Sequence, residues 1–268
     1  MKIPIYQADA FTGHLFGGNP AAVCPLTEWL SDELMQKIAA ENNLSETAFI
    51  VPEGDDYRIR WFTPGVEVAL CGHATLASAH VFFTKLGYRK NQITFLSKSG
   101  PLLVTRGADQ RITLDFPANP PIPVKEVPAG LLEGLAMEKN ASVFSTSFDY
   151  MVVAASQEEV EQLNPDFKTL AKVEARGVIV TAKGRESDFV SRCFYPQSGI
   201  DEDPVTGSAH TITTSYWAGV LGKNKLQAIQ LSARRGYLDC ELSGDRVRMT
   251  GTAVMYLQGE IEVPGVGD

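Results

Sequence analysis

The feature that most constrains this fold is a pair of similar segments that recur half a chain apart. In the first half, Phe62-Thr63-Pro64 and an acidic residue precede Gly72-His73-Ala74, which opens an expected helix. In the second half, Phe194-Tyr195-Pro196 and an acidic run precede Gly207-Ser208-Ala209, which opens another. The offset is 132 residues at the phenylalanine and 135 at the glycine, and half of the 268 residues is 134. Because order and spacing both match, the sequence indicates a duplicated unit.

Local patterns predict many strands in each half and one long helix apiece. The long helices are expected at residues 73–86, ended by Gly87, and at about 208–220, and a third helix follows the N-cap Ser31. Short helices are expected near residues 130–135 and 158–163. Strand composition recurs at residues 2–11, 47–52, 57–63, 92–97, 102–106, 111–116, 150–155, 177–181, 189–194, 227–233, 237–242, 246–250 and 254–263. The sequence therefore predicts an α+β protein whose two similar β-rich domains each wrap on one central helix.

A proline run marks the expected domain boundary. Residues 117–123, PANPPIP, contain four prolines in seven positions, which cannot sustain a strand ladder. We expect domains at residues 1–118 and 119–268. An approximate twofold axis between them would bring both helix starts to one cleft.

Composition and charge exclude several classes of protein. The 24 basic and 32 acidic residues give a net charge of −8 and a pI near 5.1, so no basic surface is available for nucleic acid. The long uncharged stretch at residues 68–84 contains Gly72, His73 and His80, which favours a buried helix over a membrane span. Asp9 interrupts the N-terminal segment where a signal peptide would be apolar, and the four widely spaced cysteines indicate reduced thiols. These features predict a cytoplasmic protein.

The two glycine-led helix starts are candidate anion sites. A helix N-terminus offers unpaired N–H groups and the positive end of the helix dipole. For Gly72 or Gly207 alone, the alternative is that the glycine merely allows close packing of helix on strand. The recurrence of the same turn in both halves favours binding of a carboxylate or similar anion.

Glu46 is the candidate acid-base residue. It lies between an expected helix and an apolar strand, where burial can raise the pKa of a carboxyl group toward neutrality. The alternative is that Glu46 only solvates a turn, as most glutamates do.

Other candidate residues lie near the two helix starts. His73 and His80 are two helical turns apart, too far to bind one metal ion together, so no metal site is expected. Pro204 stiffens the acidic run before it, so at least one of its carboxylates, such as that of Asp203, is expected to border the cleft. Ser208 lacks the G-x-S-x-G elbow of a serine hydrolase, and no nucleotide-binding motif is present.

Four motifs together resemble the phenazine-biosynthesis protein F (PhzF) family. They are FGGNPAAV at residues 16–23, NLSET at 43–47, CGHAT at 71–75 and DEDPVTGSA at 201–209, and they span both halves in order. The resemblance implies the diaminopimelate epimerase-like fold: two pseudo-equivalent domains, each a β-barrel-like sheet around a central helix, with the active site between them. It also implies that the protein uses no cofactor and forms a homodimer.

The resemblance also implies roles for particular residues. Glu46 is implied to move a proton between carbons of a substrate whose C–H bond is acidified by a neighbouring unsaturated or carboxylate-bearing group. The substrate-binding residues implied in this way are His73, Asp203, Ser208, Gly72, Gly207 and Asn19.

The chain departs from related racemases, which use two facing thiols. Cys71 stands where the first thiol would be, but Thr206 takes the second place, and a threonine hydroxyl is too weak an acid to replace it. We therefore expect an isomerase of the PhzF type that acts on a small anionic metabolite. An amino-acid racemase or epimerase on the same fold, and a non-catalytic binder of small carboxylates, remain the alternatives.

Overall fold

The computed structural model describes residues 1–138 and 141–264, and it divides the chain into two compact units. Unit 1 consists of Met1–Asp115 together with Thr250–Asp268, and unit 2 is Phe116–Met249. The sequence predicts a division between residues 118 and 119, whereas unit 2 begins at Phe116 and the chain returns to unit 1 at Thr250. The last strand, β18 (Ala253–Glu262), pairs antiparallel along the whole of β1 (Lys2–Ala10), and this pairing places the end of the chain in unit 1.

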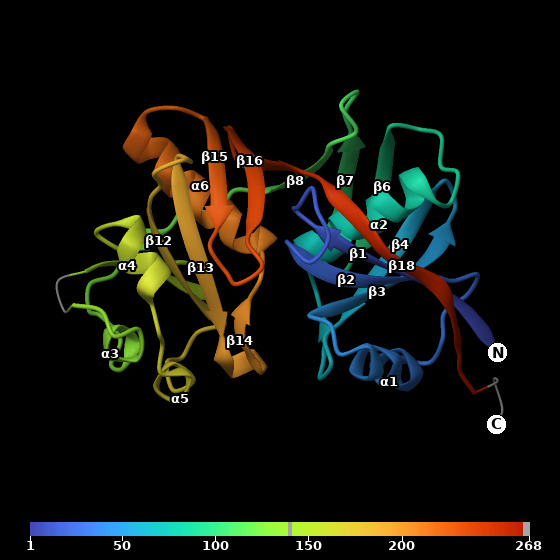
Figure 1. Ribbon diagram of the computed structural model, residues 1–268, viewed down its shortest axis with the longest axis horizontal. Helices are drawn as coiled ribbons and strands as arrows, with labels where there is room; N and C mark the ends of the chain where they lie inside the picture. Colours follow the sequence, from blue (N-terminus) through green and yellow to red (C-terminus); the bar gives the residue numbers. More distant parts are fainter. Residues whose placement is uncertain (139–140, 265–268) are drawn as a thin grey trace. The chain divides into compact units, whose positions relative to one another are not determined.

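Each unit contains one long helix and many strands (Figure 1). Besides β1 and β18, the elements that begin in unit 1 are β2 (Asn19–Pro25), α1 (Asp32–Asn42), β3 (Glu46–Glu53), β4 (Asp56–Phe62), β5 (Glu67–Val68), α2 (Gly72–Thr84), β6 (Gln92–Ser97), β7 (Gly100–Arg106) and β8 (Ile112–Pro117). Those that begin in unit 2 are β9 (Ile122–Pro123), α3 (Leu131–Gly134), β10 (Ser142–Ser145), β11 (Asp149–Val153), α4 (Gln157–Gln162), α5 (Phe167–Leu170), β12 (Gly177–Lys183), β13 (Phe189–Tyr195), a 3₁₀ turn (Pro196–Ser198), β14 (Ile200–Asp203), α6 (Gly207–Leu221), β15 (Lys225–Gln230), β16 (Gly236–Ser243) and β17 (Arg246–Gly251).

Strand pairing follows the same order in the two units. In unit 1, β1 and β2 are antiparallel, β2 and β3 parallel, β3 and β4 antiparallel, β4 and β6 parallel, and β6 and β7 antiparallel. In unit 2 the sequence is repeated by β10, β11, β12, β13, β15 and β16. The short strands β5 and β14 also correspond. β5 pairs antiparallel with β4, and β14 pairs antiparallel with the corresponding strand, β13. The duplication expected from the sequence is thus present in the topology.

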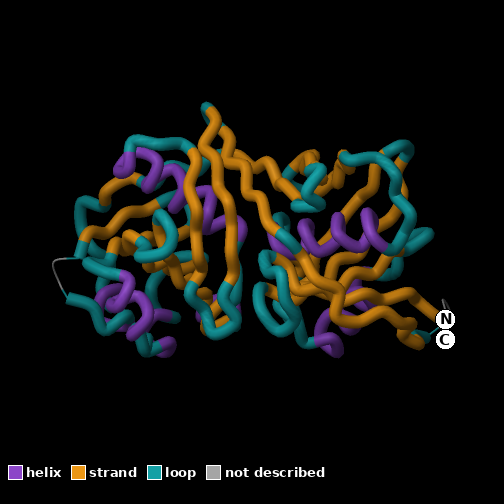
Figure 2. Tube along the Cα trace, turned by 45° about the horizontal axis from the view of Figure 1, so that its top comes forward, coloured by secondary structure: helices purple, strands orange, loops and turns teal. Residues whose placement is uncertain are grey.

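The long helices α2 and α6 are buried on most sides, as expected for central helices. Small residues allow neighbouring strands to approach closely, and in α2 every residue from Gly72 to Ala79 is buried. The buried hydroxyl of Ser78 is satisfied within α2, because it donates to the carbonyl of Ala74 at 2.6 Å. Figure 2 shows each long helix lying against strands of its own unit. Each unit therefore supports the N-terminal turn of its helix from several sides.

Several local predictions are confirmed and some boundaries differ. Ser31 caps α1, because its Oγ accepts from the backbone N–H of Leu34 at 3.2 Å. Helix α2 ends at Thr84, three residues before Gly87, which takes a left-handed conformation with φ of +69°. The sequence patterns missed the shortest elements, such as α5, where Asp166 provides the cap. Among the described residues, no helix is both long and apolar enough to cross a membrane.

Candidate functional site

In unit 1 the N-terminal turn of α2 meets the starts of two parallel strands. Asn19 begins β2, Glu46 begins β3, and His73 is the second residue of α2. The register of β2 and β3 sets Glu46 opposite Ala21. The fold therefore brings Asn19, Glu46 and Gly72-His73 together at one helix start.

The two ring nitrogens of His73 lie against different partners. Nδ1 is 3.1 Å from the side-chain amide nitrogen of Asn19, which can only donate, so Nδ1 is the acceptor. In neutral His73 the proton is then on Nε2, which lies 3.1 Å from Oε2 of Glu46. The two side chains are 4% and 13% exposed. Oε2 of Glu46 has no well-aligned hydrogen-bond donor among the described residues, so this buried carboxylate oxygen keeps a lone pair for a proton.

Three atoms of metal-binding type gather at this turn. Ligand atoms of Glu46, Cys71 and His73 all lie within 4.8 Å of one another, and the Cys71 Sγ is 3.5 Å from Nδ1 of His73. The helical spacing of His73 and His80 does not predict this group. Because both ring nitrogens of His73 already lie beside protein groups, an ion bound here would displace Asn19 or Glu46 from the ring. The contacts are better suited to orienting the imidazole than to holding a metal ion.

In unit 2 the turn before α6 is fixed by buried hydrogen bonds. The hydroxyl of Thr206 donates to Oδ2 of Asp203 at 2.5 Å, and its backbone N–H donates to Oε1 of Gln230 at 2.8 Å. The Gln230 amide nitrogen in turn donates to the carbonyl of Asp203 at 2.7 Å. Asp203 therefore lies beside this helix start. Its neighbour Glu202 instead forms an ion pair with Arg192 at 2.8 Å.

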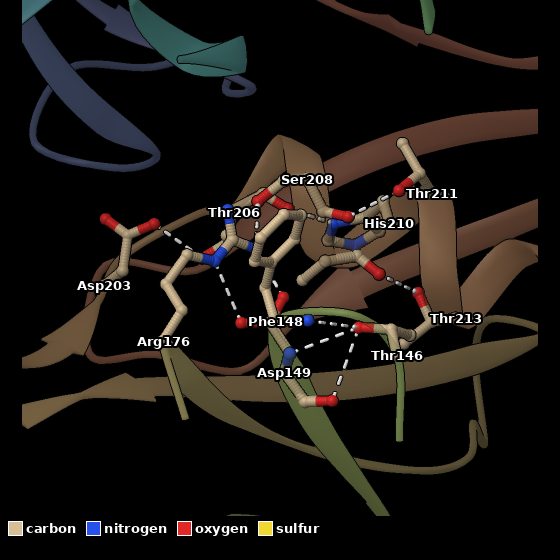
Figure 3. A network of polar contacts seen from close by, with 11 residues as sticks. Thr146, Phe148, Asp149, Arg176, Asp203, Thr206, Ser208, His210, Thr211 and Thr213 are labelled. Carbon is tan, nitrogen blue, oxygen red and sulfur yellow. Dashed lines mark hydrogen bonds and ion pairs between the residues drawn. The ribbon is translucent and has the colours of Figure 1, made fainter. Parts of the chain in front are cut away.

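Ser208 belongs to a second network at the same turn (Figure 3). Arg176 donates from Nη2 to Oγ of Ser208 at 3.1 Å, and it pairs through Nε and Nη2 with the carboxylate of Asp149. Asp149 is 1% exposed, and its charge raises the pKa of the Arg176 guanidinium further, against the opposing effect of burial. Sequence reasoning missed both residues because neither lies in a motif. The parallel register that pairs Asp149 with Gly177 is what brings them together.

The two long helices share an uncapped N-terminus. Cys71 and Thr206 occupy the N-cap positions in extended conformations, and neither side chain caps its helix. The cap carbonyl is used instead: Thr75 donates to that of Cys71 at 2.5 Å, and Nδ1 of His210 donates to that of Thr206 at 2.8 Å. By contrast α1, α4 and α5 have side-chain caps. Gly72 and Gly207 thus start helices whose first N–H groups are not covered by a cap side chain.

The two-unit fold is shared with solved structures of other proteins. A probable proline racemase from Agrobacterium radiobacter K84 superimposes with a TM-score of 0.63 at 8% identity, covering 98% of this chain and 93% of that one. A PhzF-family protein of Enterococcus faecalis superimposes with a TM-score of 0.93 at 43% identity, covering 98% and 100%. The fold expected from the resemblance is confirmed.

Sequence comparison narrows the class to one family. The family model described as phenazine biosynthesis-like protein matches residues 8–259. A protein named as an uncharacterised isomerase of Pseudomonas aeruginosa is 50% identical over 263 residues, which cover 98% of this chain and all of that protein. The chain belongs to the phenazine biosynthesis-like (PhzF) family.

Proposed function

We propose that the protein is a cofactor-independent isomerase in which Glu46 moves a proton between two carbon atoms of a small carboxylate-bearing metabolite. The single observation that carries the proposal is the buried contact of Glu46 Oε2 with Nε2 of His73 at 3.1 Å. Relatives that are named isomerases and share half of the sequence support the reaction class.

The chemistry is a proton transfer that leaves no net charge or redox change. The Glu46 carboxylate takes a proton from a carbon next to an unsaturated group, and the electron pair of the broken C–H bond shifts into that system. Glu46 then returns the proton to a different carbon, and the double bond moves. Such general acid-base catalysis requires a carboxylate with a lone pair that faces the substrate.

His73 would act by orienting Glu46. Because the Asn19 amide fixes Nδ1 as an acceptor, Nε2 of neutral His73 carries the proton and lies 3.1 Å from Oε2 of Glu46. The two atoms are not aligned for a hydrogen bond, so His73 is proposed to position the carboxylate by this contact.

Asp203, Ser208, Gly72 and Gly207 are proposed to bind the substrate. The uncapped N-termini of α2 and α6 supply backbone N–H groups suited to a carboxylate. The cytoplasmic location and the homodimer expected from the sequence remain predictions.

A racemase with two thiols is the less favoured alternative. A second thiol would be needed at the N-cap position of α6. That position holds Thr206, whose hydroxyl donates to Asp203. The thiol of Cys193 is also near this turn, but burial holds its pKa well above the ordinary value. If Cys71→Ser retains turnover, thiol chemistry is excluded.

The proposal is tested by deuterium exchange from D₂O into a panel of small unsaturated carboxylic acids, followed by NMR. We expect Glu46→Gln to lower the exchange rate by about 10²–10⁴-fold, the usual contribution of a positioned acid-base group. Glu41→Gln, an exposed change on α1, is the matched control and should keep the wild-type rate. Equal rates in Glu46→Gln and wild type would refute the role of Glu46. Ligand-induced thermal shifts without exchange in any compound would instead indicate a non-catalytic binder.

A further inference from the structure

Two nitrogens of the Arg176 guanidinium are held by hydrogen bonds, and the third is available to a ligand. Nε and Nη2 pair with the buried carboxylate of Asp149, and Nη2 also donates to Ser208. The two N–H groups of Nη1 have no partner among the residues that the structure describes, and the side chain is 40% exposed. A rigidly held arginine with an unused edge is a typical recognition group for a carboxylate.

Arg192, in the same unit, shows what a purely structural arginine looks like. Its Nε and Nη2 pair with Glu202 at 2.8 Å each, much as Arg176 pairs with Asp149. Its Nη1, however, donates to the backbone carbonyls of Val160 and Leu163 at 3.3 and 2.8 Å, and its side chain is only 13% exposed. The two arginines therefore differ at the Nη1 edge, which is satisfied by backbone carbonyls only in Arg192.

Arg176 lies one residue before the position that corresponds to Glu46. Glu46 is the first residue of β3, and the first residue of the corresponding strand β12 is Gly177, directly after Arg176. His73 and Ser208 are both the second residue of their helices. A charged side chain contacts this second residue at 3.1 Å in each unit, from Glu46 to His73 and from Arg176 to Ser208. The charged group beside the helix start is therefore an acid in unit 1 and a cation in unit 2.

Two further polar hydrogens belong to residues that contact the Arg176 guanidinium. The Ser208 hydroxyl accepts from Arg176, which leaves its own O–H group to donate. Tyr195 packs its ring 5.7 Å from the Arg176 guanidinium, is 7% exposed, and has a hydroxyl with no hydrogen-bond partner among the described residues. A buried phenol without a partner is costly unless a ligand satisfies it.

We infer that Arg176 is a specificity-determining residue that binds a carboxylate of the substrate, with one oxygen on Nη1 of Arg176 and the other on the hydroxyl of Ser208. This inference rests on the proposed function only in taking the bound anion to be the substrate. Because Asp149 balances the charge of Arg176, selectivity comes from two convergent donors that match two carboxylate oxygens. A neutral amide of the same size offers only one such acceptor.

The test compares benzoate with benzamide by NMR titration of the ¹⁵N-labelled protein. Benzoate should shift the amide signals of residues near Ser208, and benzamide should bind about tenfold or more weakly. Arg176→Lys keeps the charge but loses the fork, so its Kd for benzoate should rise by about tenfold or more. Arg192→Lys is the matched control and should stay within about twofold of wild type. No shift in wild type, or equal affinities in wild type and Arg176→Lys, would overturn the inference.

A second variant guards against unfolding. Removing Arg176 alone would leave Asp149 buried without its partner, so the double change Asp149→Asn with Arg176→Gln removes both charges. It should keep a cooperative melting transition and lose benzoate binding; tight binding by the folded double variant would also overturn the inference. Titrating Glu46→Gln separates the two proposals. If it still catalyses exchange, the proposed function fails, whereas the dependence of benzoate binding on Arg176 is judged independently.

Discussion

The N-terminal turns of α2 and α6 occupy the same place in the two units but carry opposite chemistry. At the first, Glu46 lies against His73; at the second, Arg176 lies against Ser208. The backbone frame around them is the same, since each helix follows a short strand and each cap carbonyl accepts from the side chain of the helix's fourth residue. The same backbone frame thus carries different side chains in the two units, and the roles proposed for them are proton transfer in unit 1 and anion binding in unit 2.

The sharpest test of this comparison changes the second residue of each helix. We expect His73→Asn to lower the deuterium exchange rate by about a hundredfold or more through kcat, because the contact to the Glu46 carboxylate is lost. Ser208→Ala should raise KM by about tenfold and leave kcat nearly unchanged, because only a hydrogen bond to bound substrate is removed. Steady-state exchange kinetics of both variants measure this split. Identical kcat losses would mean that the two turns do not differ in role.

The second test concerns the residues that bond to the cap carbonyls. Burial lowers the pKa of His210 from 6.5 to about 4, whereas its counterpart Thr75 does not titrate. Between about pH 4 and pH 6.5, His210 is protonated in the unfolded chain and neutral in the folded protein. The stability present above pH 6.5 is therefore lost as the pH falls toward 4, by about 3 kcal/mol in all.

His210→Thr installs the side chain found in α2 and should remove this part of the pH dependence. Chemical denaturation at pH 7 and pH 5 gives the free energy of unfolding of wild type and variant. The quantity compared is the loss between the two pH values, which is separate from any stability that the variant loses at pH 7 through a cavity. The same loss of stability in both proteins would place the titrating group elsewhere.

The third test concerns Gly177, which is the first residue of β12 as Glu46 is of β3. A Cβ at Gly177 would overlap the ring of Tyr195, so Gly177→Ala should lower the free energy of unfolding by about 1–3 kcal/mol. Gly219→Ala, in the last turn of α6, meets nothing within 4 Å and should instead raise it by about 0.5–1 kcal/mol. Urea denaturation distinguishes the two. A neutral Gly177→Ala would show that the ring of Tyr195 can move aside.

The smallest effect is expected from removing metal ions. Although Glu46, Cys71 and His73 offer three ligand atoms, the proposed mechanism assigns Glu46 and His73 to each other. Dialysis against EDTA should therefore leave the exchange rate within about twofold. A loss that added zinc restores would make the group at α2 a metal centre and remove the basis of the comparison.

The sequence predicted the parts of the fold and site that rest on short-range patterns. A glycine-led turn followed by small residues predicts a central helix wherever it occurs, so α2 and α6 and their first residues were found. Arg176 and Asp149 were missed because their contact depends on a parallel strand register that no local pattern encodes. The sequence likewise did not predict the pairing of β18 with β1. The alternating residues of β18 predict a strand but do not say which strand it pairs with.

The pairing of β18 with β1 has a consequence for how the protein is made. Unit 2 is one continuous stretch of chain. In unit 1, by contrast, β1 is synthesised long before its partner β18. At typical synthesis speeds of about 5–20 residues per second, the interval exceeds ten seconds. Throughout this time β1 has an unpaired edge, the kind of surface on which nascent chains associate wrongly. The half that carries Glu46 is therefore completed after the half that carries Arg176.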